Sequence, residues 1–136
     1  MSTNRIRAAF LLGACLLLAA TTARAQNNYV GSDLYRTYCS SCHGPNAKGD
    51  GPLADSLRVR PPDLTLIGKR MGGFSADKVC KIIDGRAPVK GHGGADMPVW
   101  GDAFKSSRDG YSEDAVKARI EALAEHLADI QDKSAK

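Results

Sequence analysis

The clearest pattern of apolar and polar positions lies near the C-terminal end of the chain. From Val116 to Ile130, apolar side chains recur every three or four residues, which places them on one face of a helix. Ser112 is a typical N-cap, and the carboxylates of Glu113 and Asp114 suit the positive end of a helix dipole. The pattern predicts a long helix whose apolar stripe packs on another element. The stripe consists of Val116, Ile120, Leu123, Leu127 and Ile130.

A second helical pattern lies before the glycine-rich part of the chain. We predict a helix that begins at residues 31–33, with Ser32 as its N-cap, and ends before the pair Gly44-Pro45. Residues 44–62 are rich in glycine and proline and are predicted to form a loop. The helix is the natural packing partner for the C-terminal apolar stripe.

Two short helices are predicted in the middle of the chain. The first runs from Leu64 to about Met71, and the second covers residues 76–84, with Ser75 as its N-cap and Gly85 at its end. No segment has a convincing strand pattern. Together these patterns predict an all-α fold of three to four helices joined by Gly/Pro-rich loops.

The start of the chain has the pattern of a secretory signal peptide: two arginines, an apolar run over residues 8–20, and an A-x-A cleavage motif at residues 23–25. The apolar run is too short for a membrane span, which needs about 20 residues. We therefore expect a signal peptide over residues 1–25, export to the periplasm, and a mature domain over residues 26–136 with no membrane span. The residues around Cys15 resemble a lipoprotein processing site, which leaves lipid attachment as an alternative.

Charge narrows the possible partners. The chain has 19 basic and 15 acidic residues, and three of the basic ones lie in the predicted signal peptide, which leaves 16 and 15 in the mature chain. The basic residues are interspersed with acidic ones and form no run with interleaved aromatic side chains, so nucleic-acid binding is not expected. Residues 58–108 hold ten basic and five acidic residues. This middle third is a candidate surface for acidic protein partners.

The strongest chemical signal is the pentapeptide Cys39-Ser40-Ser41-Cys42-His43. Two cysteines three residues apart lie on one helical turn, where both thiols can add to the vinyl groups of one haem. The adjacent imidazole of His43 supplies a nitrogen ligand to the iron. The motif therefore predicts one haem c, covalently attached through Cys39 and Cys42, with His43 as an axial ligand.

Two other interpretations of the cysteine pair are weaker. A redox-active C-x-x-C motif is typical of a βαβ context, which is not visible in this sequence. A zinc site needs a second pair of ligands, and Cys80 alone cannot supply it. We expect Cys80, inside the predicted helix 76–84, to be a buried small side chain or a free thiol.

A second axial ligand is expected in the glycine-rich segment 90–101. A thioether opposite a histidine raises the reduction potential toward values typical of electron carriers. Met97 stands in this segment directly before a proline, and its ligand type and loop context make it the preferred candidate. His92 would instead give bis-histidine ligation, and Met71 or an open site is a further alternative.

Two other residues are candidates for contacts around the haem. A metal-bound histidine usually donates its other ring N–H to an acceptor, and the carbonyl of Pro52 is our candidate acceptor for His43. The alternative is that Pro52 only shapes a turn. We expect Trp100 and Phe104 to pack in the core or against the haem. The indole N–H of Trp100 is also a candidate donor to a haem propionate.

With these motifs, the chain resembles the class I c-type cytochromes over residues 30–131. The resemblance implies a class I cytochrome c fold around one haem, in which the first and last helices cross and the proline of Gly51-Pro52 holds the proximal histidine. His126 stands where that family often has an aromatic side chain. Outside the attachment motif, the matching residues are Gly31, Tyr35, Met97, Pro98, Leu123 and Leu127.

The expected function is electron transfer by a periplasmic single-haem carrier, and no residue is assigned a catalytic role. The expected partners are redox proteins, such as a periplasmic dehydrogenase or a membrane oxidase or reductase, and the carrier is expected to be a monomer. Two alternatives stay open: a cytochrome subunit bound to a periplasmic dehydrogenase, and a ligand-binding haem sensor or enzyme. The residues that could steer acidic partners are Lys69, Arg70, Lys78, Lys81, Arg86, Lys90 and Lys105.

Overall fold

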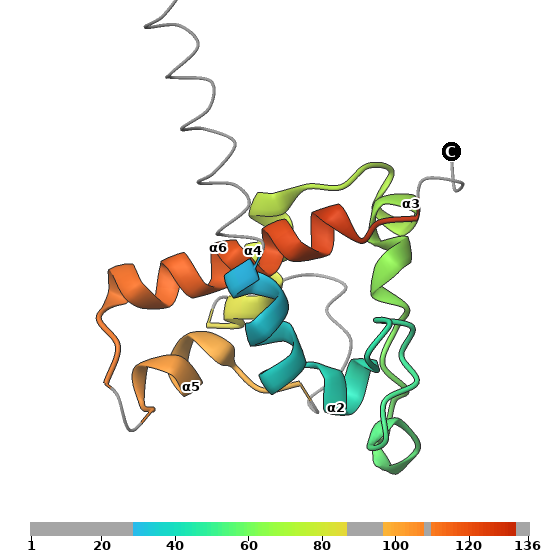
Figure 1. Ribbon diagram of the computed structural model, residues 1–136, viewed down its shortest axis with the longest axis horizontal. Coiled ribbons are helices and arrows are strands. Elements are labelled where there is room, and N and C mark those ends of the chain that lie inside the picture. The colour runs from blue at the N-terminus through green and yellow to red at the C-terminus, as the bar shows by residue number, and fades with distance from the viewer. Residues whose placement is uncertain (1–28, 87–96, 108–109, 133–136) are drawn as a thin grey trace, which may run out of the picture.

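The computed structural model describes residues 29–86, 97–107 and 110–132. Within these ranges every regular element is a helix, and none of these helices is long and apolar enough to cross a membrane. Figure 1 shows short helices gathered around one long helix, α6. The predicted all-α class is confirmed. The predicted signal peptide, with Cys15, and the alternative ligand His92 lie outside the described residues.

The long C-terminal helix α6 (Glu113–Asp129) supplies much of the core, as its apolar stripe predicts. Ser112 caps it, because its hydroxyl accepts a hydrogen bond from the N–H of Ala115 at 3.3 Å. Burial of one large apolar side chain such as Leu123 contributes about 2 kcal/mol. The buried residues of α6 are Val116, Ile120, Ala122, Leu123, Ala124 and Leu127.

The N-terminal helix, described over residues 29–38, crosses α6 (Figure 1). Gly31 is buried at the crossing, where an added Cβ would collide with the carbonyl oxygen of Ala122 and lie 2.9 Å from Cβ of His126. Only a residue without a side chain lets the two backbones approach this closely. One turn further on, the ring of Tyr35 lies 5.4 Å from that of His126. The crossing implied by the resemblance is therefore present, with the imidazole of His126 as the ring on α6.

The start of this helix was predicted incorrectly. The chain is already helical at Tyr29, so Ser32 lies inside the helix and does not cap it. Its hydroxyl donates a hydrogen bond to the carbonyl of Tyr29 at 3.2 Å. A serine can satisfy its hydroxyl on the preceding turn in this way, so a serine alone does not mark where a helix begins.

Helix α4 (Ala76–Asp84) has the predicted bounds and caps. The hydroxyl of Ser75 accepts from the N–H of Lys78, and Gly85 adopts the left-handed conformation, with φ of 70°, that ends the helix. Its buried side chains, Val79 and Ile83, face the core.

Helix α5 (Trp100–Lys105) was not predicted. Gly101 lies within it and Pro98 lies just before it, and both residues weaken a helical pattern. Tertiary packing supports it instead, because α5 contacts both α4 and α6 and buries Phe104 to 2% exposure.

Shorter elements cover the remaining side of the core. The predicted loop contains one 3₁₀ turn, η1 (Ala54–Ser56). The predicted helix after it begins as a 3₁₀ turn, η2 (Leu64–Leu66), and continues as α3 (Ile67–Met71). Asp63 caps this unit, since its carboxylate accepts from the N–H of Thr65 at 2.8 Å.

The side chain of Gln131 links the end of α6 to the α3 region by hydrogen bonds. Its amide nitrogen donates to the carbonyls of Leu64, at 2.8 Å, and Leu127, at 2.7 Å. Its amide oxygen accepts from the N–H of Gly68 at 2.9 Å. Two of these three hydrogen bonds, those with Leu64 and Gly68, join segments that are far apart in the sequence.

Candidate functional site

Residues 39–43 form one turn that continues the N-terminal helix. The N–H of Cys39 donates to the carbonyl of Tyr35 at 2.9 Å, and the N–H of His43 donates to the carbonyl of Cys39 at 2.9 Å. The turn is helix α2 (Ser40–His43), which lies at the lower end of the N-terminal helix in Figure 1. The backbone thus places the two cysteines and the histidine of the motif on a single turn.

Both cysteines of the motif are partly exposed, and neither forms a disulfide within the described residues. Burial, together with a smaller effect of the nearby Cys42, raises the pKa of the Cys39 thiol to about 12. Cys39 also packs against the apolar core. The surroundings therefore suit an uncharged sulfur, such as a thiol or a thioether, better than a thiolate.

His43 is partly buried, and its Nδ1 atom is fully buried without a hydrogen-bond partner in the described structure. Burial lowers the pKa of the imidazole, which favours the neutral ring. The backbone carbonyl of Pro62 raises the pKa, but by less than burial lowers it. A neutral imidazole has a nitrogen lone pair available for a metal. A buried, unpartnered ring nitrogen is unusual in a folded protein and indicates a functional role.

The chain after His43 folds back onto the same turn, and we call residues 39–53 the proximal segment. Three backbone N–H groups of the returning chain donate to carbonyls of the turn: Gly49 to His43 at 2.9 Å, Gly51 to Cys42 at 3.2 Å, and Leu53 to Ser41 at 2.9 Å. At Gly51, an added Cβ would collide with the carbonyl oxygen of Ser41 and lie 2.7 Å from the carbonyl carbon of Cys42. Glycine is needed here because two backbones are in contact.

A buried hydrogen bond ties the proximal segment to the first helix. The Tyr35 hydroxyl donates to the carbonyl of Gly44 at 2.7 Å. Burial raises the pKa of Tyr35, so the hydroxyl keeps the proton that it donates. The N–H of Ala47 donates to the same carbonyl at 3.1 Å.

Residues 97–101, which we call the distal segment, contain the second candidate ligand, Met97. Met97 is partly buried. The ring of Trp100 lies 5.6 Å from that of Tyr38, and the ring of Phe104 lies 5.4 Å from it. Because Tyr38 directly precedes Cys39, these contacts place the start of α5 beside the end of the N-terminal helix. The structure therefore brings the distal segment to the side of the molecule that carries the cysteine pair.

The remaining candidate residues differ in their surroundings. Met71 packs against the hydrophobic core, which gives its side chain a structural role. Cys80 is partly buried against the same core, and burial is the main cause that raises its pKa.

Pro52 is exposed, and its predicted contact with His43 stays a prediction. The carbonyl that interacts with His43 here is that of Pro62, whose signal in the sequence is the rigid pair Pro61-Pro62.

The residues present fit a covalently bound haem. One helical turn offers two cysteine sulfurs and an imidazole whose buried Nδ1 atom has no partner in the described structure, inside an all-helical domain with an apolar core. This combination defines a small c-type haem protein. The sequence model of the cytochrome c family matches residues 30–130, and the chain belongs to that family. Membership implies haem-based electron transfer with covalently attached haem c. No solved structure was found to match the chain.

Proposed function

We propose that the chain is a single-haem electron carrier in which Cys39 and Cys42 hold the haem and His43 and Met97 are the axial ligands. The observation that carries the proposal is the buried Nδ1 atom of His43, which has no partner in the described structure, on the turn that also carries both cysteines. When bound, the haem supplies an iron that cycles between the ferric and ferrous states. The protein itself makes or breaks no substrate bond.

The proximal residues would fix the orientation of the haem. Two thioethers from Cys39 and Cys42 restrict rotation and tilt of the macrocycle, and His43 offers one nitrogen to the iron. The other ring N–H needs an acceptor, since a hydrogen bond at that nitrogen orients a metal-bound histidine. Pro62 is better supported as that acceptor than Pro52, because its carbonyl interacts with the imidazole.

Three observations support Met97 as the second ligand. It is partly buried, and it precedes a residue, Trp100, that packs beside the end of the N-terminal helix. The chain's other described methionine, Met71, packs against the core instead. Trp100 is half-buried and packs against Tyr38, and its ring is suited to contact the haem in addition.

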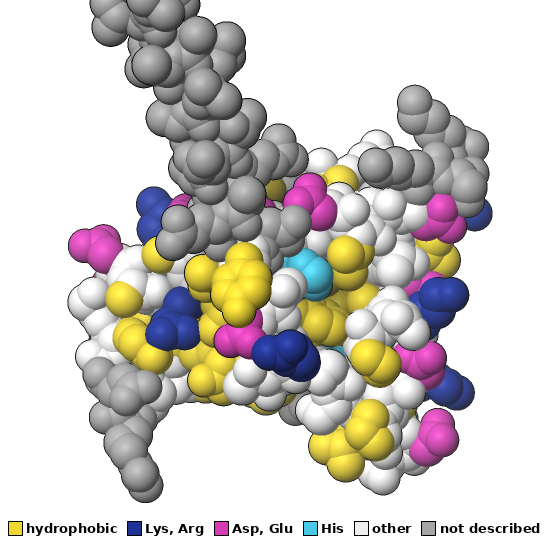
Figure 2. All heavy atoms as spheres, viewed as in Figure 1, with side chains coloured by type: hydrophobic (Ala, Val, Ile, Leu, Met, Phe, Trp, Pro, Cys, Tyr) yellow, Lys and Arg dark blue, Asp and Glu magenta, His cyan; other side chains and the backbone are white. Residues whose placement is uncertain are grey.

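Export and partners belong to the same proposal. We infer a signal peptide over residues 1–25 and a periplasmic mature domain over residues 26–136, with redox proteins as partners. On the face seen in Figure 2, basic and acidic side chains are interspersed, and apolar groups reach the surface between them. Such a surface favours short-lived contacts with several partners over one strongly charged docking site. Mass spectrometry of the purified protein would test the cleavage after residue 25.

The ligand assignment is tested by the absorption spectrum of the purified ferric holoprotein. A ferric haem with a thioether ligand has a weak charge-transfer band in the near infrared. We expect this band in the wild type and in Met71→Ala, the matched control, and its complete loss in Met97→Ala.

Absence of the band from the wild type would overturn Met97 as the ligand. In that case His92 or an open site would be the next candidate. Tight binding of CO to the reduced wild type at neutral pH would point to an open site and to a sensor or enzyme.

A further inference from the structure

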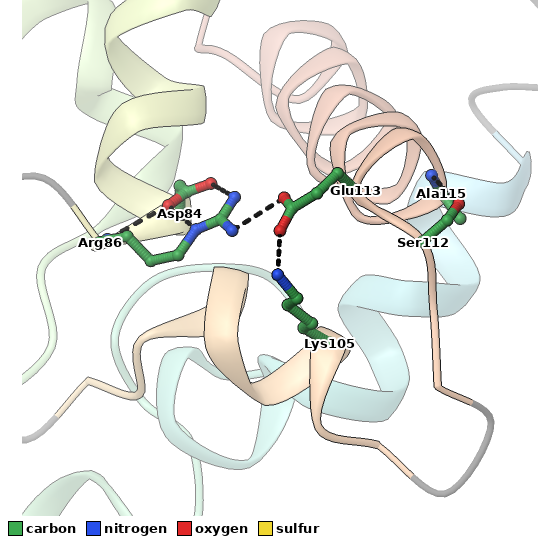
Figure 3. A network of polar contacts seen from close by, with 6 residues as sticks. All are labelled: Asp84, Arg86, Lys105, Ser112, Glu113 and Ala115. Atoms are coloured by element: carbon green, nitrogen blue, oxygen red, sulfur yellow. Dashed lines mark hydrogen bonds and ion pairs between the residues drawn. The ribbon is translucent and has the colours of Figure 1, made fainter.

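A network of charged side chains joins α4, α5 and α6 next to the distal segment (Figure 3). The guanidinium of Arg86 binds the Asp84 carboxylate through two nitrogens, each at 2.8 Å, and donates a third hydrogen bond to Glu113 at 2.9 Å. The other oxygen of Glu113 accepts from the ammonium of Lys105 at 2.5 Å. Arg86 thus links the end of α4 to the start of α6, and Glu113 extends the link to α5.

This network lies directly against the distal segment. An added Cβ at Gly101 would collide with Nε of Arg86 and lie 2.7 Å from Oδ1 of Asp84. An added Cβ at Gly85 would lie 3.3 Å from Cα of Val99. The end of α4 and the residues that follow Met97 are therefore in contact through backbone and charged side chains, without bulky residues between them.

The central pair of the network is better shielded from water than the other ion pairs of the surface. The side chains of Arg86 and Asp84 are 32% and 26% exposed, whereas those of Lys117 and Glu121, a pair on α6, are 74% and 52% exposed. A two-point arginine–carboxylate contact also fixes direction, which a single exposed pair does not. The two-point contact between Arg86 and Asp84 is therefore suited to hold the neighbouring distal segment in one position.

We propose that Arg86 is a positioning residue for the axial ligand: by binding Asp84 and Glu113 against Gly101, it holds the distal segment so that the Met97 thioether stays directed toward the haem iron. The inference rests on the proposed ligation by Met97. Arg86 is assigned no bond to the iron and acts through the distal segment. Its loss should raise the fraction of molecules in which Met97 has left its place, without removing the ligand.

The test uses the ferric holoprotein and added imidazole, a ligand that competes with a thioether for ferric iron. A competing ligand binds more tightly when a larger fraction of molecules has an open position, so we expect Arg86→Gln to raise the imidazole affinity by about tenfold. Lys117→Gln is the matched control, since it also removes one positive charge and breaks an ion pair, but that pair lies within α6 and does not include Arg86. Its imidazole affinity should equal that of the wild type.

A second variant separates positioning from general loss of stability. Gly101→Ala retains every charge but places a Cβ where the Arg86 guanidinium lies. Alanine is the better helix former, so an effect on α5 alone would leave imidazole binding unchanged or weaken it. If Arg86 positions the distal segment, Gly101→Ala should raise the affinity in the same direction as Arg86→Gln.

The outcomes distinguish this inference from the ligand assignment. If the wild type has the near-infrared band but Arg86→Gln binds imidazole no more tightly than Lys117→Gln, Met97 remains the ligand and the positioning role is wrong. An unchanged or lower affinity in Gly101→Ala also contradicts that role. If the band is absent from the wild type, the proposed ligation fails, and the role of Arg86 fails with it.

Discussion

The proximal and distal segments are held in place by different kinds of interaction. In the proximal segment, backbone N–H groups of Gly49, Gly51 and Leu53 bind carbonyls of the turn that carries the cysteines and His43. In the distal segment, the described contacts include aromatic packing of Trp100 and the charged network of Arg86. The proximal segment depends mainly on peptide groups, which every residue has, with one further hydrogen bond from the Tyr35 hydroxyl, and the distal segment depends mainly on particular side chains.

This difference has a consequence for how each side responds to change. A peptide hydrogen bond survives most substitutions and is little affected by ionic strength. A partly exposed ion pair is lost when one of its side chains is replaced, and it weakens as the ionic strength rises. We therefore expect the proximal segment to be less sensitive to substitution and salt than the distal segment, which holds the proposed second ligand. Adjusting the second ligand is one way to tune a haem potential without disturbing attachment.

The largest expected effect is on the proximal side. Replacing both cysteines, Cys39→Ser with Cys42→Ser, should abolish covalent haem attachment, because no other described thiol lies on that turn. Haem staining of a denaturing gel measures the attachment. Cys80→Ser is the control and should retain full staining. Covalent haem in the double variant would contradict the assignment of the motif.

Backbone contact in the proximal segment predicts the next largest effect. Gly51→Ala should lower the free energy of unfolding by about 3 kcal/mol, since the new methyl group would press on two backbone carbonyls. Gly72→Ala is the matched control. Its φ is +69°, but nothing lies within 4 Å of the added Cβ, so strain alone should cost about 1 kcal/mol. Urea unfolding of both variants measures the difference, and equal values would mean that the close contact does not matter.

A smaller effect is expected where a side chain supports the proximal segment. Tyr35→Phe removes the buried hydrogen bond to the Gly44 carbonyl, which keeps the N–H of Ala47 as a donor. Because the carbonyl stays partnered, the loss should be about 1 kcal/mol in the free energy of unfolding. Urea unfolding measures it. The imidazole affinity should not change, and a tighter affinity would show that the two sides are coupled.

The smallest effect should come from salt, and only on the distal side. At 1 M salt the screening length falls to about 3 Å, so the contacts of Arg86 with Asp84 and Glu113 should weaken and the imidazole affinity of the wild type should rise by about twofold. Arg86→Gln has lost these contacts and should show little change with salt. The same salt response in both proteins would indicate that the distal segment is not held by this network.

Local signals explain which helices the sequence could predict. The bounds of α4 and α6 follow from the caps Ser75, Gly85 and Ser112, whose hydrogen bonds involve only neighbouring residues. The start of the N-terminal helix was wrong because Ser32 bonds within the helix. Helix α5 was missed because packing on α4 and α6 stabilises it more than its own sequence does.

The candidate site divides in the same way. Cys39, Cys42 and His43 lie within five consecutive residues, so one helical turn brings them together. The sequence motif is therefore sufficient to predict that they are neighbours in space. The interaction of Pro62 with His43 joins residues from two sides of a loop, and the contact of Arg86 with Glu113 joins two helices. Such pairings depend on how the chain closes in space, which a single sequence does not specify.

The crossing of the N-terminal helix with α6 also bears on the order of events during synthesis. Gly31 and Tyr35 find their packing partners, Ala122 and His126, at the opposite end of the described chain. A ribosome makes the cysteine-bearing segment before α6, so this crossing cannot form until α6 has been made. Both cysteines would therefore be accessible for attachment while the chain is still unfolded, and folding would follow the chemistry.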